Sequence, residues 1–155
     1  MQTFLDASGR TWSIHIDVAT IRRVRSLAAI DLMQVLGGDL LERLAADPVL
    51  LVDVLAAICQ PQMDAQRVNA ESFASGMLGD AIDHAATALL KGIADFSPSP
   101  TRVLLLQLID AGRAKQAQAQ EILLRQVQAM ATVTPPPSGA SLPSLPESPD
   151  STPRP

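Results

Sequence analysis

The feature that most limits the possible folds is a nearly continuous apolar stretch between Pro48 and Cys59. Asp53 is the only charged residue in it. A helix that is apolar almost all round is normally covered by neighbours on several sides. Asp47 supplies a capping carboxylate directly before Pro48, and proline suits the first position of a helix. Pro61 disfavours helical backbone in the residue before it and so marks the expected end. We therefore predict a buried central helix over Pro48–Cys59.

The composition favours a small domain with an aliphatic core. Aromatic residues make up 3% of the 155 residues and tyrosine is absent, so Leu, Ile, Val, Ala and Met must fill the interior. The formal net charge of -4 argues against a general nucleic-acid-binding protein, which usually carries a basic surface. The single cysteine, Cys59, allows no internal disulfide and is expected to pack as a small apolar residue. No signal peptide or membrane-spanning run is recognisable, so we expect a cytoplasmic location.

Two short segments before the helices have the pattern of β-strands. They are Gln2–Leu5 and Thr11–Ile16, and in the second segment every other residue is apolar, beginning with Trp12. Gly9 permits the tight turn that a hairpin needs. A lone two-stranded hairpin is marginal in water, so its Trp12 face is expected to pack on the helices.

The chain after the hairpin alternates between helical periodicity and capping or helix-breaking residues. Asp17 is expected to cap a helix that reaches Ala29, and Asp39 with Glu42 has the spacing of a capping box before the next helix. Further helical segments are expected at Asp31–Leu36, after Asn69, over Ile82–Phe96 and from Ser99 onward.

The predicted fold class is therefore mostly α, in three parts. Residues 1–16 form an N-terminal β-hairpin, and residues 17–131 form a multi-helix bundle that ends in a long C-terminal helix. Residues 132–155 form a disordered tail rich in proline and serine. Eight of the chain's 12 prolines lie in this last part, which buries too little apolar surface to offset the cost of ordering.

Few residues suggest catalytic or metal chemistry. Asp80, Asp83 and His84 lie within about one helical turn, and the spacing of Asp80 and His84 suits two metal ligands on one helix face. A third ligand is not evident, and a solvated face explains the same residues. Phosphate-binding glycine loops, zinc-ligand spacings and nucleophile elbows do not occur in the sequence. We predict a non-enzymatic protein with no catalytic, cofactor-binding or metal-binding residues and no cofactor.

The only basic cluster consists of Arg22, Arg23 and Arg25. It can contact phosphate or an acidic partner, or it can be the solvated face of a helix. Aromatic residues that would stack on single-stranded nucleic acid are not interleaved with it. Nucleic-acid binding by a helical regulatory protein stays an alternative on this basis.

Apolar residues without an obvious partner inside the domain form two groups. One group follows Asn69, and the other lies near the end of the last predicted helix. Each group can contact another protein, belong to the ordinary core or mediate self-association. Their members are Phe73, Met77 and Leu78 in the first group, and Ile122, Leu123, Val127 and Met130 in the second.

The order of motifs along the chain resembles a known family. Phe4–Ile16 reads F-x-D-x-x-G-R-x-W-x-I-x-I and is followed by a helix and by Asp31-Leu32. The series continues with LAADPVLLVDVL, with the tetrapeptide CQPQ at 59–62 and with GDAID at 79–83, up to Phe96 and its prolines. Over roughly residues 1–100, this series resembles the tail assembly chaperones of tailed phages and prophage-like elements.

The resemblance implies a function in viral tail morphogenesis without catalysis. Such a protein binds the tape-measure protein in the host cytoplasm and keeps its hydrophobic helices soluble while tail-tube subunits assemble around it. A structural component that stays in the tail is an alternative reading of the same resemblance.

Overall fold

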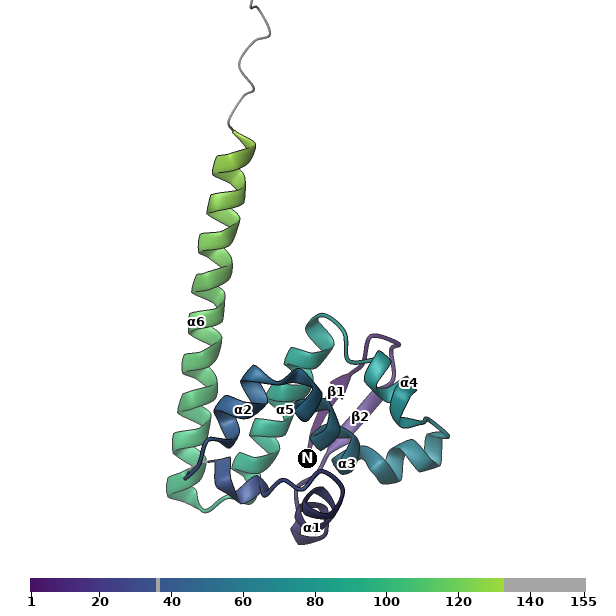
Figure 1. Ribbon diagram of the computed structural model, residues 1–155. Coiled ribbons are helices and arrows are strands. Elements are labelled where there is room, and N and C mark those ends of the chain that lie inside the picture. The colour runs from purple at the N-terminus through teal and green to yellow at the C-terminus, as the bar shows by residue number, and fades with distance from the viewer. Residues whose placement is uncertain (36, 133–155) are drawn as a thin grey trace, which may run out of the picture. The chain divides into compact units, whose positions relative to one another are not determined.

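The computed structural model describes residues 1–35 and 37–132, and it is mostly helical (Figure 1). Within this range an N-terminal antiparallel hairpin precedes six α-helices, the last of them long, which confirms the predicted fold class. The chain forms two units, Met1–Ala117 and Gln118–Pro155. All of the predicted Pro-rich tail except residue 132 lies outside the described residues. The elements are β1 (Gln2–Leu5), β2 (Thr11–Ile14), α1 (Val18–Leu27), the 3-10 helix η1 (Leu32–Val35), α2 (Leu40–Ala46), α3 (Pro48–Gln66), α4 (Ala70–Ser75), α5 (Asp80–Phe96) and α6 (Ser99–Ala131).

The hairpin contributes its inner face to the core. Phe4 pairs with Trp12 across the two strands, and Gln2 pairs with Ile14. Because side chains alternate between the faces of a sheet, Phe4, Trp12 and Ile14 share one face, and all three are buried. The ring of Trp12 meets that of Phe73 in α4 edge-on, with 4.9 Å between centroids and an interplanar angle of 79°. The prediction that the Trp12 face packs on the helices is thus confirmed.

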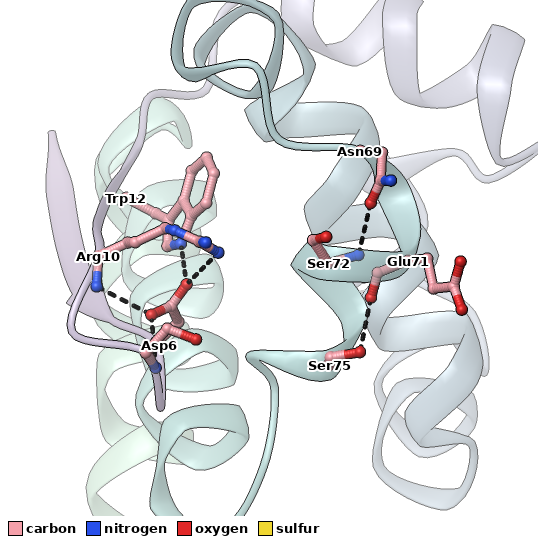
Figure 2. Close-up of polar contacts among 8 residues, drawn as sticks. Asp6, Arg10, Trp12, Asn69, Glu71, Ser72 and Ser75 are labelled. Carbon is pink, nitrogen blue, oxygen red and sulfur yellow. Dashed lines mark hydrogen bonds and ion pairs between the residues drawn. The ribbon is translucent and has the colours of Figure 1, made fainter.

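A buried carboxylate organises the turn between the strands (Figure 2). Asp6 Oδ1 accepts hydrogen bonds from the backbone N–H groups of Ser8 and Arg10, both at 2.9 Å. Asp6 Oδ2 accepts one from the indole Nε1 of Trp12 at 3.0 Å. Gly76 lies so close that a Cβ there would be 2.9 Å from Asp6 Oδ2. The turn is therefore tied to both the core tryptophan and the end of α4.

Helix α3 lies at the centre of the core, as its apolar sequence predicts. Helices α1, α2, α4 and α5 and strand β2 all pack against it. The Asp47 carboxylate caps its first turn, accepting hydrogen bonds from Val49 N at 3.0 Å and Leu50 N at 3.1 Å. Its buried residues are Leu51, Val54, Leu55, Ala57, Ile58, Cys59 and Met63.

The prediction that Pro61 ends the central helix is wrong, because α3 continues to Gln66. Proline removes one backbone donor from the helix, but tertiary contacts hold the residues that follow. The Gln62 amide accepts a hydrogen bond from Ser13 N at 2.9 Å and donates one to Ser13 O at 2.7 Å. Met63 is fully buried next to it. The helix ends instead at Arg67, which adopts the left-handed conformation with φ 56°.

The other predicted helix starts differ in detail from the structure. Asp17 caps α1 as expected, because its Oδ1 accepts a hydrogen bond from Thr20 N at 2.6 Å. Asp39 precedes α2 without a side-chain cap, so the predicted capping box is wrong. Its backbone (φ -87°, ψ 6°) lacks the extended conformation that directs a capping side chain onto the first turn. The segment expected at Asp31–Leu36 is the short 3-10 helix η1.

Helix α5 packs against β1 and, with fewer contacts, against β2, and it lies next to the hairpin in Figure 1. The approach is close at Gly92, where an added Cβ would lie 3.0 Å from Ile14 Cγ2 and 3.2 Å from Ile16 Cγ1. The guanidinium group of Arg102 caps the end of α5. It donates hydrogen bonds to Ala94 O at 3.1 Å and to Asp95 O at 2.7 Å. These contacts explain how α6 can begin directly after α5 without leaving the last carbonyl groups of α5 unsatisfied.

In the part of the chain that the structure describes, no single helix is both long and apolar enough to cross a membrane. Helices α2 and α3 reach the required length and composition only as a pair, and they are bent by 109° at the break between them.

Candidate partner-binding surfaces

The C-terminal end of α6 carries a stripe of exposed apolar residues. Ile122, Leu123, Val127 and Met130 are between 58% and 76% exposed. Their spacing places them along one side of the helix, because residues three and four apart are neighbours on a helix surface. We call these four residues the α6 stripe. Leu124, which the sequence analysis did not single out, is also 62% exposed at the border of the stripe.

The opposite side of the same helix segment is polar. Arg125 Nη2 lies 2.7 Å from Glu121 Oε1, an i,i+4 ion pair that is exposed on both sides. Gln128 falls on this side by helical spacing, three residues after Arg125 and seven after Glu121. The end of α6 is therefore amphipathic, and its apolar side is accessible to water.

The first predicted apolar group is mostly core. Phe73 is 0% exposed and Met77 is 5% exposed, whereas Leu78 is 65% exposed. Phe73 is held by the Trp12 ring, so its side chain packs inside the domain and is not available on the surface. Of the readings open for this group, ordinary core therefore holds for Phe73 and Met77, which are not accessible to a partner, and Leu78 alone of the three is accessible to another chain.

The first half of α6 packs on the domain through few residues. Val103–Ile109 is apolar enough to dock on the domain, and it does so through Leu105 and Ile109, which are buried. A helix can bury one stripe against a single neighbour, so residues on its other sides stay in water. Those residues, which sequence reasoning missed as surface, are Val103, Leu104, Leu106 and Leu108.

Two of the three clustered arginines bond within the domain. Arg25 Nη2 lies 2.8 Å from Asp31 Oδ2, and Arg23 Nη1 donates to Ile58 O at 3.3 Å. The hydrogen bond from Arg25, with a second from Met33 N, lowers the pKa of Asp31 below its usual value. Arg22 is exposed and has no such partner among the described residues.

The residues considered for metal chemistry, Asp80, Asp83 and His84, lie on α5, and the one considered for nucleophilic chemistry, Cys59, lies in α3. Gln116 Nε2 donates to Asp83 Oδ2 at 3.4 Å on the surface. Within residues 1–35 and 37–132, no group of three or more His, Cys, Asp and Glu residues is arranged to hold a metal ion. Cys59 is fully buried, as predicted, and burial raises the pKa of its thiol to about 12. A thiol in this environment is not an activated nucleophile.

Comparisons with known proteins return no match: no family model, no curated protein and no solved structure is significantly similar to the chain.

Proposed function

We propose that the chain is a tail assembly chaperone that holds an apolar helical segment of the tape-measure protein against the α6 stripe. The observation that carries the proposal is the exposure of all four stripe residues, at 58% to 76% each. The order of sequence motifs, which resembles that of tail assembly chaperones, supports the choice of client.

The physical basis of the proposed contact is burial of apolar surface between two amphipathic helices. Fully burying one large aliphatic side chain contributes roughly 1.5–3 kcal/mol, so a stripe of four can supply a useful binding energy after the costs of association. A partner helix with apolar residues at i, i+3, i+4 and i+7 presents an apolar side of its own that can pack along the stripe. The resemblance to tail assembly chaperones implies that the long apolar helices of the tape-measure protein are the segments kept soluble.

Co-expression with a tape-measure protein encoded beside this chain tests the proposal. The wild-type chain should raise the amount of soluble tape-measure protein and co-purify with it. A double variant, Leu123→Glu with Val127→Glu, places two charges on the stripe and should reduce the co-purified client by about tenfold or more.

The matched control makes the same change in net charge on the polar side of the same helix. Arg125→Gln with Gln128→Glu should leave co-purification and solubility at the wild-type level. No gain in client solubility with the wild-type chain would refute the proposal, and so would an equal loss for both double variants. Mass spectrometry of purified particles distinguishes a chaperone, which should be absent from them, from a structural tail component.

A further inference from the structure

A groove follows the outer edge of β1. Its volume is about 270 Å³, and all four residues of β1 form one of its walls. Helix α5 forms the other wall, joined by one residue of α6. The residues contributed by the two helices are His84, Thr87, Ala88, Lys91 and Arg113.

The backbone along this edge of β1 is unpaired. Asp6 N donates to Arg10 O at 2.9 Å, which makes Asp6 and Arg10 a hydrogen-bonded pair at the turn. Hydrogen-bonded and non-hydrogen-bonded pairs alternate along an antiparallel ladder, so Leu5 and Thr3 belong to non-hydrogen-bonded pairs. Their N–H and C=O groups consequently point away from β2, on the side of the groove.

Ser13 gives independent support for this register. It is the partner of Thr3, and both of its backbone groups bond outward to the side chain of Gln62. On the β2 edge a glutamine amide thus takes the place of a neighbouring strand. On the β1 edge no described side chain or backbone group does the same for Thr3 or Leu5, and both residues are exposed.

The groove is also positively charged. Lys91 and Arg113 line it, together with His84, and no carboxylate is among the lining residues. Neither cation forms an ion pair within the described part of the chain. Two carboxylates of α5 near the groove bond to side-chain amides: Asp83 accepts a hydrogen bond from Gln116 at 3.4 Å, and Asp95 accepts one from Gln2 at 2.9 Å.

We propose that this groove binds an extended peptide segment that carries Asp or Glu side chains, as a third strand beside β1. Outward N–H and C=O groups on an edge strand form a template for another strand. The four residues of β1 span roughly 13 Å at 3.3 Å per residue, which suits a peptide of similar length. Carboxylates on the peptide complement Lys91 and Arg113, whereas a bound helix would leave the strand edge unpaired because its own backbone groups are already bonded.

Selection from a displayed library of random octapeptides tests this site. Peptides retained by the wild-type chain should contain more Asp and Glu than the starting library. Thr3→Pro removes one outward backbone N–H donor, a change that an edge strand tolerates. It should lower the affinity for the selected peptides about fivefold or more. Thr11→Pro is the matched control, because Thr11 occupies the equivalent outward position on β2, away from the groove.

A second pair of variants tests the charge. Arg113→Glu reverses a charge in the groove and should lower the affinity for acidic peptides about fivefold or more. Lys115→Glu is the matched control, because Lys115 lies two residues along the same helix and outside the groove lining, and it should leave this affinity unchanged. Acidic residues no more frequent among retained peptides than in the library would overturn the proposal. Equal effects of a variant and its control would also overturn it.

Amide hydrogen exchange shows whether the peptide pairs with the strand. In the free protein the amides of Thr3 and Leu5 should exchange quickly while that of Phe4 is protected. A selected acidic peptide should protect Thr3 and Leu5. If it binds without protecting them, strand addition is ruled out. If the groove does not bind acidic peptides, the proposed role of the α6 stripe is not affected, because the stripe variants test client binding in a separate experiment.

Discussion

The indole Nε1 of Trp12 donates a hydrogen bond of 3.0 Å to Oδ2 of Asp6, and both residues are buried. The same carboxylate accepts two backbone N–H groups of the hairpin turn through Oδ1. A buried charge is tolerated only where hydrogen bonds replace those of water, and here three donors do so. The contact links the turn, the core side of the sheet and α4, so the hairpin cannot detach without exposing a core tryptophan.

Asp6→Asn is expected to lower the free energy of unfolding by about 1.5–3 kcal/mol. The substitution keeps the size of the side chain but replaces one acceptor oxygen with an NH₂ donor, which then faces an N–H donor in either orientation. Urea denaturation measures the effect. Asp53→Asn, an exposed position on α3, is the control and should change stability by less than about 0.5 kcal/mol. Equal stability of the two variants would contradict the assigned role of Asp6.

Gly92→Ala is expected to destabilise the protein by about 1–3 kcal/mol, because its Cβ would press on Ile14 and Ile16 at 3.0 and 3.2 Å. Gly112→Ala is the matched control. An added Cβ at Gly112 of α6 meets nothing within 4 Å, so alanine should raise stability by up to about 1 kcal/mol through helix propensity. Opposite signs in thermal or urea unfolding are the expected result, and a stabilising Gly92→Ala would show that α5 does not approach the hairpin this closely.

Gln62→Ala is expected to lower the free energy of unfolding by about 1–2 kcal/mol, because it leaves the partly buried N–H and C=O of Ser13 without hydrogen-bond partners. The amide of Ser13 should also exchange faster with solvent. Gln60→Ala removes only an exposed hydrogen bond to Asp64 and serves as the control, with an expected change below about 0.5 kcal/mol. An unchanged exchange rate at Ser13 would mean that another group satisfies this edge.

Acid should remove part of the stability of α1. The hydrogen bond from Thr20 N lowers the pKa of Asp17 below its usual value, with smaller contributions from His15 and Arg23. A depressed folded-state pKa contributes stability above the unfolded pKa, and this contribution is lost as pH falls from about 4 through the lower folded value. Asp17→Asn keeps a capping oxygen without titrating. Between pH 5 and pH 3, its urea midpoint should therefore fall less than that of the wild type. A parallel fall in both proteins would contradict the assignment.

The thiol of Cys59 should react with a disulfide reagent only when the protein opens. Burial raises its pKa to about 12, so at pH 8 the thiolate form is scarce as well as inaccessible. The labelling rate should be low in buffer and should rise sharply through the urea unfolding transition. Rapid labelling in buffer would show that α3 is not buried as the structure describes.

Much of the fold follows from local sequence patterns. The two strands, the cap at Asp17, the start of α3 at Pro48 and the long last helix were predictable because caps, turns and periodicity act over a few residues. The candidate surfaces were predictable only in part. The apolar residues near the end of α6 are exposed, but Phe73 and Met77 are core, because helical spacing shows that residues share a face and not what covers that face.

Local patterns in the chain encode where most elements begin and that the core is aliphatic, because a capping side chain or a prolyl ring acts on its own turn of the chain. The extension of α3 past Pro61 depends on tertiary contacts, since the groups that hold Gln62 come from residues far away in sequence and Met63 is buried in the core. Folding also determines that the β2 edge is closed by a glutamine while the β1 edge stays open beside two cations. Pairing across a strand edge depends on groups brought together by folding, and no local pattern encodes it.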